Sequence, residues 1–528
     1  MSPDQVADWT SLLPPLIAIG LALWLRAVIP SIFLGIWVGM VLESGEGLNG
    51  VFTALLETFQ VRIFQVMLDA DNVSVLLFTG MIGGMVGIIS RNGGMHGIVN
   101  LVMGWAHTVR RGQLSVWFLG LCIFFDDYTN TLVVGNTVRP VTDRLKISRE
   151  KLAYLVDSTA APVACIAVLT TWIGYELGLI NKAIANLEGF TMNATGVFLN
   201  SIAYSFYPIL AIFFVFLVSW TCRDFGPMRK AELRSRVTGQ VEPVSSGEAL
   251  DAPLDTQVAE HIPRRAINAL LPILTLILSC FVSLYLTGEG DTLRARLGSA
   301  DVYRALLWGS FLGASVAGAL TLGQRIMSLE ALIKSWVRGV SVMVEPLIIL
   351  VLAWALSDTT SALGTADFLV AATGDKLILP LVPAGTFLLA AVTAFATGSS
   401  WGVMAILLPL VIPVVWSAIL AGGGVPAESM PLVFATVASV LCGAVWGDHC
   451  SPISDTTVLS SLASGCDHVE HVRTQIPYAL LVGAVAVIVC LVPVGYGMPW
   501  WMGLLLSVAV LVLAHRLLGG PVEVPDGH

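Results

Sequence analysis

The chain is short of charged residues. Only 12% of its 528 residues are Asp, Glu, Lys or Arg, whereas 56% are hydrophobic. A soluble protein carries about 25% charged residues, so most of this surface is expected to face hydrocarbon rather than water. Apolar runs near the roughly 20 residues that cross a bilayer recur along the sequence. The scarcity of charge therefore predicts an all-α polytopic membrane protein.

Motifs of several other protein classes are absent as well. The eight cysteines form no CxxC pair, and no nucleotide-binding loop, Ser/His/Asp motif or nucleic-acid-binding surface is evident. His449 and Cys450 are adjacent, but a metal site needs further ligands, and we expect His468 and His471 beyond the span, toward water. The sequence therefore predicts no metal cofactor, no nucleic-acid partner and no enzymatic activity.

Apolar segments divide the chain into two halves. The first apolar run follows Asp4 and Asp8 rather than a basic leader, so no cleavable signal peptide is predicted. The arginine-rich polar stretch 222–264 is expected to be a cytoplasmic linker, because loops rich in Lys and Arg stay inside. Besides two hairpins, spans are predicted at 12–25, 28–43, 72–90, 152–180, 198–220, 266–287, 303–322, 340–357, 430–465, 476–495 and 499–516.

A re-entrant hairpin is predicted at 112–138. Basic residues flank this segment at 110–111 and at 139–151, so both flanks are expected to be cytoplasmic. The segment is too short for two full spans. A hairpin that enters and leaves on the same side fits, with its tip at 126–130. Non-helical backbone is tolerated at that depth only where protein or a wet cavity covers it.

The second half contains a counterpart at 383–418. Its polar centre is 397–402, and its flanks are expected outside because few basic residues surround them. Aligning Asp126 with Ser399 also aligns Pro140 with Pro413. The second segment therefore predicts a hairpin that enters from the opposite side of the membrane.

A polar motif interrupts the helix that follows each hairpin. The motif is 157–162 within the broken helix 152–180, and 448–452 within the broken helix 430–465. Broken helices that meet at mid-membrane in inverted repeats are typical of secondary transporters. We therefore predict two inverted-topology repeats, each with a re-entrant hairpin and an interrupted transmembrane helix: 1–221 and 265–495, followed by an extra span and tail at 496–528.

The breaks gather oxygen ligands. A carboxylate at the bilayer centre costs about 3 kcal/mol or more, so carboxylates at two symmetric breaks need a compensating role. Sodium prefers such oxygens, and burial favours the protonated form of a carboxylate. A site that binds either sodium or protons gives antiport. The candidates are Asp126, Asp127, Asn130, Asp157, Ser158, Thr159, Thr397, Ser399, Ser400, Asp448, Ser451, Asp455 and Thr456, with sodium at Asp127, Asp157 and Asp448.

Structural roles compete with these assignments. Asp is a favoured helix N-cap, so Asp126 or Asp127 could simply cap the second hairpin arm, and Asp157 and Asp448 stand in similar contexts. Two such positions at symmetry-related breaks favour function, whereas Asp455 fits a polar contact between helices equally well. Weaker candidates for a pathway, which also fit interfacial or paired positions, are Glu176, Glu345 and Asp358.

The segment 447–457, GDHCSPISDTT, resembles the hallmark of the NhaC-type sodium/proton antiporters. The segments 125–130, 157–162 and 397–402 look like further family elements, and the resemblance spans roughly 70–480. It implies membership of the ion-transporter superfamily, with an elevator motion of a transport domain against a dimeric scaffold. It also implies a homodimer in the bacterial cytoplasmic membrane, with lipid, sodium and protons as partners.

The leading hypothesis is an antiporter that exchanges sodium, or lithium, for protons. The rival is a sodium- or proton-coupled exchanger of a small organic solute, since some proteins that resemble this family exchange such solutes. No arginine stands at either hairpin tip, which argues against a carboxylate substrate but not against an amine or amino acid. A channel fits two inverted breaks poorly, and a membrane hydrolase would need a serine partner for His449.

Overall fold

The computed structural model describes residues 8–25, 27–44, 50–185, 187–242, 262–288, 300–365, 368, 378–424, 426–452 and 454–522. Of the predicted linker and tail, 243–261 and 523–528 lie outside the described residues. Ten described helices are long and apolar enough to cross a bilayer, and two bent helix pairs raise this number to twelve. The prediction of an all-α polytopic membrane protein is confirmed.

The first half is almost entirely helical, with one short strand before its last helix. Its elements are η1 (Trp9–Leu12), α1 (Leu13–Leu25), α2 (Val28–Ser44), α3 (Val51–Glu57), η3 (Thr58–Ile63), α4 (Phe64–Leu68), α5 (Ala70–Arg91), α6 (Gly94–Met103), α7 (Val109–Cys122), α8 (Asp127–Arg144), α9 (Arg149–Asp157), α10 (Ala161–Ile166), α11 (Thr171–Ile184), α12 (Ala194–Ser201), η4 (Ile202–Tyr204), α13 (Phe206–Thr221), β1 (Arg223–Asp224) and α14 (Gly226–Thr238).

The second half follows with a similar run of helices, and its last strand pairs antiparallel with β1. Its elements are α15 (Ile267–Thr287), α17 (Val302–Gly323), α18 (Leu329–Val342), α19 (Val344–Ala362), η6 (Leu379–Leu381), α21 (Val382–Thr397), α22 (Ser400–Ala421), α23 (Pro426–Cys450), α24 (Asp455–Ser464), α25 (His468–Val485), η7 (Ala486–Leu491), α26 (Val492–Gly495), α27 (Trp500–Leu518) and β2 (Gly520–Pro521).

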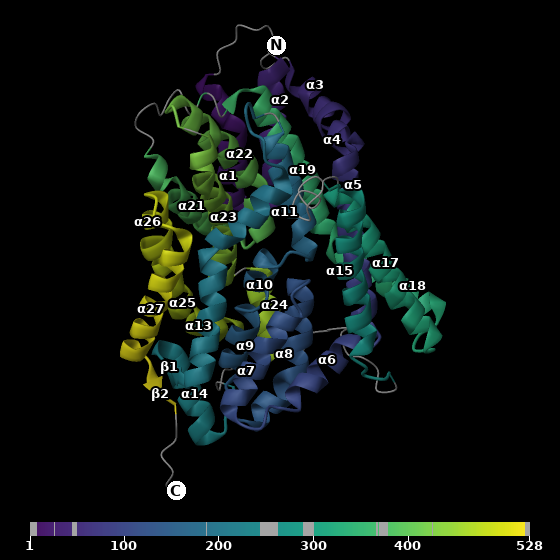
Figure 1. The fold of residues 1–528 in the computed structure, drawn as a ribbon, viewed down its shortest axis with the longest axis vertical. Helices are drawn as coiled ribbons and strands as arrows, with labels where there is room; N and C mark the ends of the chain where they lie inside the picture. The colour runs from purple at the N-terminus through teal and green to yellow at the C-terminus, as the bar shows by residue number, and fades with distance from the viewer. Residues whose placement is uncertain are drawn as a thin grey trace.

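Two helical hairpins occupy opposite ends of the long axis of the molecule (Figure 1). One consists of α7 and α8 near the lower end, and the other of α21 and α22 near the upper end. Both tips are buried, because Phe125 and Ser400 are almost wholly covered by protein. This placement is the one that re-entrant hairpins require; the inverted relation of the two repeats and their boundaries stay predictions.

An interrupted helix follows each hairpin. The pair Arg149–Ile166 and Thr171–Ile184 is bent by 45°, and α23 ends at Cys450 before α24 begins at Asp455. Helix α24 then packs against α8 and α9, which belong to the first half. The second broken helix therefore completes the polar centre of the first half.

Glycines allow α21 and α23 to approach closely. A Cβ on Gly447 would lie 2.2 Å from the carbonyl oxygen of Ala391, and one on Gly443 would lie 2.4 Å from that of Phe387. Only residues without a side chain permit such backbone contact between membrane helices. The hairpin and the broken helix of the second half are thus in direct contact along their length.

Two regions differ from the sequence predictions. The run Val51–Leu68 is apolar and long enough to span a bilayer, and it is missing from the predicted spans. Arg62 pairs with Glu43 of α2, so its charge is satisfied within the protein. The predicted linker 222–264 begins with structure: helix α14 packs against α9 and α25, and Asp224 of strand β1 pairs with Lys151 of α9.

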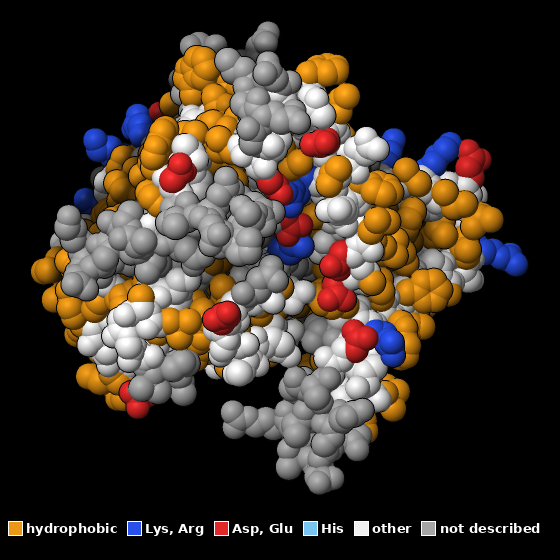
Figure 2. All heavy atoms as spheres, turned by 90° about the horizontal axis from the view of Figure 1, so that it is seen from above, with side chains coloured by type: hydrophobic (Ala, Val, Ile, Leu, Met, Phe, Trp, Pro, Cys, Tyr) orange, Lys and Arg blue, Asp and Glu red, His pale blue; other side chains and the backbone are white. Residues whose placement is uncertain are grey.

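The upper end of the molecule is seen face-on in Figure 2. Hydrophobic side chains form much of the outline, and acidic and basic side chains meet near the centre of this face. Helices α5, α15, α17 and α18 form a lobe at one side (Figure 1), and many of their large apolar side chains are exposed. An exposed apolar band of this kind is what a lipid-facing surface requires.

Candidate functional site

The two hairpin tips are built in the same way, by a side chain that caps the second arm. Asp126 has extended backbone angles and accepts hydrogen bonds from the amide (2.8 Å) and hydroxyl (2.6 Å) of Thr129. Ser399 is also extended and accepts from the amide of Gly402 at 3.3 Å. An N-cap of this type satisfies an amide that has no partner in the helix.

Asp126 is engaged on both carboxylate oxygens. Its second oxygen accepts from the hydroxyl of Thr171 at 3.1 Å, and the Thr171 amide donates to the carbonyl of Phe125 at 2.8 Å. These bonds fasten the first tip to the start of α11. The capping role that competed with ion binding is therefore the one that the geometry gives to Asp126.

Asp127, the first residue of α8, faces a small cavity instead. One of its carboxylate oxygens accepts from the indole nitrogen of Trp172 at 3.2 Å. The cavity has a volume of about 10 Å³, which is close to the room that one water molecule needs. It is lined by Asp127, Tyr128, Gly398, Ser399, Ser400, Trp401, Asp448, Asp455 and Thr456, and thus by both hairpin tips and the second break.

Asp448 faces this cavity from the last turn of α23. Its carboxylate accepts from the hydroxyls of Ser454 and Thr456, the latter at 2.9 Å. Both donors belong to the break or to the start of α24, so the carboxylate ties the two helix segments together. Asp448 therefore caps no helix N-terminus, in contrast to the structural alternative considered from the sequence.

The cavity is negative: Asp127 and Asp448 are buried in it, and Asp455 is exposed at its edge. No lysine or arginine in the described part of the chain pairs with Asp127 or Asp448. The ring of Trp401 packs against Trp172 with centroids 5.3 Å apart and against Tyr175 at 4.6 Å. Helices α21 and α23 end at the cavity, whereas α8, α22 and α24 begin there, so the partial charges of the helix ends oppose one another and the negative charge comes from the carboxylates. Together these groups favour a small cation.

Asp157 lies at the end of α9 in a second polar cluster and is not among the residues that line the cavity. One carboxylate oxygen accepts from Ser460 at 3.2 Å, and the other accepts from the amide of Gln475 at 2.5 Å. The Nε2 atom of His471 is 3.5 Å from the latter oxygen, and that of His449 is 3.8 Å away. Asp157 is thus surrounded by side chains of the second half.

The histidines differ from the sequence expectation. His471 is fully buried against Asp157, so its predicted position toward water is wrong. His449 has a serine neighbour after all, because its Nε2 atom lies 2.9 Å from the hydroxyl of Ser158, and its Nδ1 atom lies 2.6 Å from that of Tyr207. Ser158 is completely covered, which closes this pair to any substrate.

Helix α24 connects the two clusters. Thr456 donates to Asp448 from its first turn, and Ser460, one turn later, donates to Asp157. Residues four apart share a helix face, so a single face of α24 contacts both carboxylates. A shift of α24 would therefore change both clusters at once.

Other predicted ligands hold the backbone of the breaks. Asn130 donates from its amide to the carbonyls of Gly120 (2.9 Å) and Thr159 (2.8 Å). The hydroxyls of the remaining residues donate to nearby carbonyls: Thr159 to Leu155, Thr397 to Thr393, and Ser451 to Phe395. Asp455, whose carboxylate lies 3.5 Å from the hydroxyl of Tyr128, and Ser400 remain at the cavity.

Sequence reasoning missed several residues of these clusters. Trp172, Tyr207 and Gln475 contribute hydrogen bonds to the buried carboxylate or imidazole groups. Gln475 could have been found, because it is an uncharged polar residue at the edge of an apolar run. Among the described residues, no group of three or more His, Cys, Asp or Glu side chains could hold a metal ion; the cavity offers the carboxylates of Asp127, Asp448 and Asp455 together with hydroxyls.

The weaker candidates are dispersed. Asp358 pairs with Lys182 at 2.8 Å, and Glu345 is exposed. Glu176 is completely buried in α11, and neither of its carboxylate oxygens has a hydrogen-bond partner among the described residues. None of the three lines the carboxylate cavity.

Two hairpins that meet at a negative cavity beside broken helices define a multi-pass membrane transporter. The sequence pattern of the Na+/H+ antiporter family matches residues 163–495. The chain belongs to this family, so the predicted membership is confirmed and the protein is a secondary antiporter.

Three relatives show how varied similar proteins are. An uncharacterized protein of Haemophilus influenzae is 30% identical over 522 residues, which cover 96% of this chain and 95% of that protein. The malate-2H+/Na+-lactate antiporter of Bacillus subtilis is 34% identical over 30% of this chain and 32% of its own length. The arginine/ornithine antiporter ArcD of Halobacterium salinarum is 38% identical over 19% of this chain and 18% of its own length.

Proposed function

We propose that the protein exchanges sodium, or lithium, for protons across the bacterial cytoplasmic membrane. The observation that carries this proposal is the cavity at which Asp127 of one hairpin and Asp448 of the second broken helix meet without a basic partner. Its volume suits an ion that has lost most of its water. Sodium and protons are the transported species, and no cofactor is needed.

In the proposed cycle, the two carboxylates hold either the cation or protons. The hydroxyls of Ser399, Ser400 and Thr456 complete the cation shell, and the Trp172–Trp401 pair excludes water. Burial stabilises protonated carboxylates when no cation is present. Binding of one species therefore displaces the other, and this competition gives exchange without further machinery.

Asp157 has a different role in this proposal from the one predicted. Gln475, Ser460 and two imidazoles surround it, so we assign it the positioning of α9 and α24 rather than direct sodium contact. We further propose an elevator motion of the hairpins and broken helices in a homodimer. The lipid-facing lobe of α5, α15, α17 and α18 suits the static part of such an assembly (Figure 1).

The test is a flux measurement on the full-length protein in sealed vesicles without any organic solute. Sodium should drive proton movement in wild type, and Asp448→Asn should abolish it. Near-normal exchange by that variant would sink the assignment. Exchange that appears only after an amino acid, amine or carboxylate is added would favour the second candidate, a coupled exchanger of organic solutes, as the names of two relatives suggest.

A further inference from the structure

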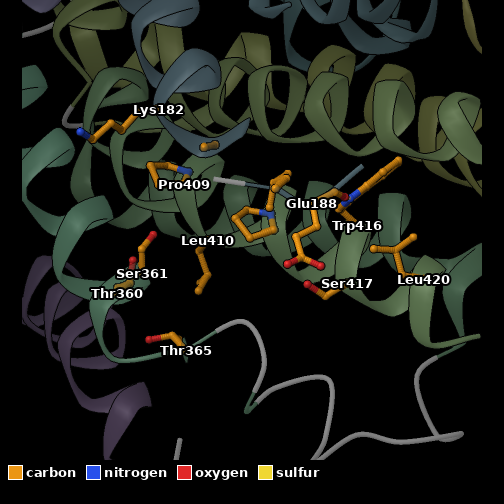
Figure 3. Close-up of a pocket in the computed structure, with 14 residues that line it drawn as sticks. Lys182, Glu188, Thr360, Ser361, Thr365, Pro409, Leu410, Trp416, Ser417 and Leu420 are labelled. Carbon is orange, nitrogen blue, oxygen red and sulfur yellow. The ribbon is translucent and has the colours of Figure 1, made fainter. Parts of the chain in front are cut away.

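A second cavity opens at the other end of α11, away from the carboxylate cavity. It has a volume of about 470 Å³ and lies between the ends of α11 and α19 and the outer half of α22 (Figure 3). Ligand pockets in proteins span about 300–1,000 Å³. No residue lines both cavities, and neither the proposed exchange nor the hairpin tips account for this one.

Among the described residues, the charged groups at this cavity leave one carboxylate without a basic partner. Lys182 lines it, but the ammonium pairs with Asp358 at 2.8 Å. Glu188 has an exposed carboxylate, and no ion pair joins it to another described residue. Figure 3 shows this carboxylate directed toward the hydroxyl of Ser417. An anion would meet a lysine that is already neutralised, whereas a cation meets a free carboxylate.

Hydroxyl groups add hydrogen-bond acceptors to the same cavity. Thr365 donates its hydroxyl proton to the carbonyl of Ser11 at 2.8 Å, and Thr360 donates to that of Ser357 at 3.0 Å. Because these protons are engaged, each oxygen keeps lone pairs that can accept from a ligand. Ser361 and Ser417 also line the cavity. Such acceptors suit the N–H donors of an ammonium or guanidinium group.

The remaining wall is apolar and held in place. Leu410, Trp416 and Leu420 of α22 line it. The indole nitrogen of Trp416 donates to the carbonyl of Glu188 at 2.8 Å, and its ring packs edge-on against Phe190 with centroids 4.8 Å apart. These contacts fix the Glu188 backbone against α22. A bare sodium ion would leave this surface unused.

We propose that the cavity at the ends of α11, α19 and α22 binds a small organic cation, an amine or guanidinium with an apolar body. Glu188 receives the charged group, the hydroxyls accept its other donors, and the Trp416 wall contacts the apolar part. This proposal does not rest on sodium/proton exchange at the carboxylate cavity. It predicts a solute site whether or not that solute is transported.

Titration calorimetry on the purified full-length protein tests the charge requirement. The probes are 2-phenylethylamine, its neutral counterpart 2-phenylethanol and the anion phenylacetate, each corrected against empty micelles. We expect saturable binding of the amine alone, weakened about tenfold by Glu188→Gln, because a hydrogen bond to a charged group is lost. Glu428→Gln, an exposed carboxylate at the start of α23 that does not line the cavity, should leave the affinity unchanged.

Protection of an introduced cysteine tests the location. Ser417→Cys should react with a maleimide more slowly when the amine is saturating, and wild type measures the reaction of the native cysteines. Leu420→Cys, on the rim, repeats the test if the first variant does not fold. Any one of three results would overturn the proposal. They are equal binding of the neutral alcohol, an unchanged affinity in Glu188→Gln, and labelling rates that are the same with and without the amine.

Discussion

The polar centres of the two halves share the same backbone arrangement but carry different side chains. In each, a capped tip starts the second hairpin arm, and the following helix breaks beside it. The first tip carries two adjacent carboxylates, Asp126 and Asp127, whereas the second carries only the hydroxyls of Ser399 and Ser400. The backbone plan therefore does not dictate the charge, and the chemistry can differ between halves that fold alike.

The two broken helices differ in how their carboxylates are satisfied. Asp157 accepts hydrogen bonds from an amide and a hydroxyl and lies beside two imidazoles, and all of these partners are side chains of the protein. Asp448 receives two hydroxyls and otherwise faces the cavity. A carboxylate with fixed partners stabilises the fold, and one with an open side can bind a mobile ligand. This contrast supports the proposed division, in which Asp448 takes part in transport and Asp157 holds the fold.

The largest expected effect distinguishes the two hairpin tips. Asp127→Asn should reduce sodium-driven proton exchange by about 100-fold or more, because losing one charge of a buried set costs about 3 kcal/mol. Ser399→Ala removes one neutral hydroxyl, worth about 1 kcal/mol, and should cost only a few-fold. Vesicle flux assays at matched protein density would measure both.

Melting temperatures in detergent serve as the control for that comparison, since both variants should stay near wild type. Equal losses of exchange in the two variants, with folding intact, would show that the asymmetry of the tips has no functional meaning.

The next effect concerns the packing of each hairpin on its broken helix. Gly447→Ala places a methyl group 2.2 Å from a backbone carbonyl of α21, so the two helices must separate. Gly120→Ala meets the hydroxyl of Thr159 at 2.1 Å and its Cβ at 2.4 Å, so rotation of that side chain cannot relieve the contact and the backbone must move. Overpacking costs about 1–3 kcal/mol, and we expect both variants at the upper end of this range.

Thermal unfolding in detergent measures how much stability Gly447→Ala and Gly120→Ala lose relative to wild type. Gly385→Ala, in the same hairpin, is the matched control because a Cβ there meets nothing within 4 Å. Alanine favours helix over glycine by about 1 kcal/mol, so this variant should be at least as stable as wild type. If Gly447→Ala or Gly120→Ala is as stable as Gly385→Ala, the close contact between that hairpin and its broken helix is overestimated.

A third comparison contrasts the partners of the two carboxylates. Gln475→Leu leaves the carboxylate of Asp157 and the carbonyl of His449 without their amide donor, which should destabilise the fold by about 2 kcal/mol. Ser454→Ala removes one hydroxyl from Asp448 and should cost about 1 kcal/mol. Unfolding in denaturant reports both. A Gln475→Leu protein as stable as wild type would remove the architectural role of Asp157.

The sequence predicted the hairpins and breaks because they depend on local features. Polar tips in apolar segments, flanking charges and capping residues all follow from composition and spacing, and Asp126 and Ser399 lie at equivalent positions of their hairpins as the alignment expected. The candidate residues Asp127, Asp448, Asp455 and Thr456 do meet at one cavity. Local chemistry thus indicated which residues approach the centre.

The predictions from the sequence failed for residues whose position or partner depends on contacts between helices. His471 follows a break, so we expected it toward water. Helix α25 begins at His468, however, and places His471 beside Asp157. The missed span Val51–Leu68 contains Arg62, whose partner Glu43 lies on another helix. Trp172 has no sequence feature that connects it to Asp127. Long-range partners of this kind require coordinates, since spacing gives no information about which helices pack together.

The smallest effect tests whether Asp126 is only a cap. Asn caps a helix about as well as Asp, so Asp126→Asn should change stability by less than about 0.5 kcal/mol and keep exchange within a few-fold of wild type. Asp126→Ala loses the bonds to Thr129 and should cost about 1 kcal/mol. If Asp126→Asn instead abolished exchange with folding intact, the first tip would contribute two transport carboxylates, and the division between capping and ion binding drawn here between Asp126 and Asp127 would fall.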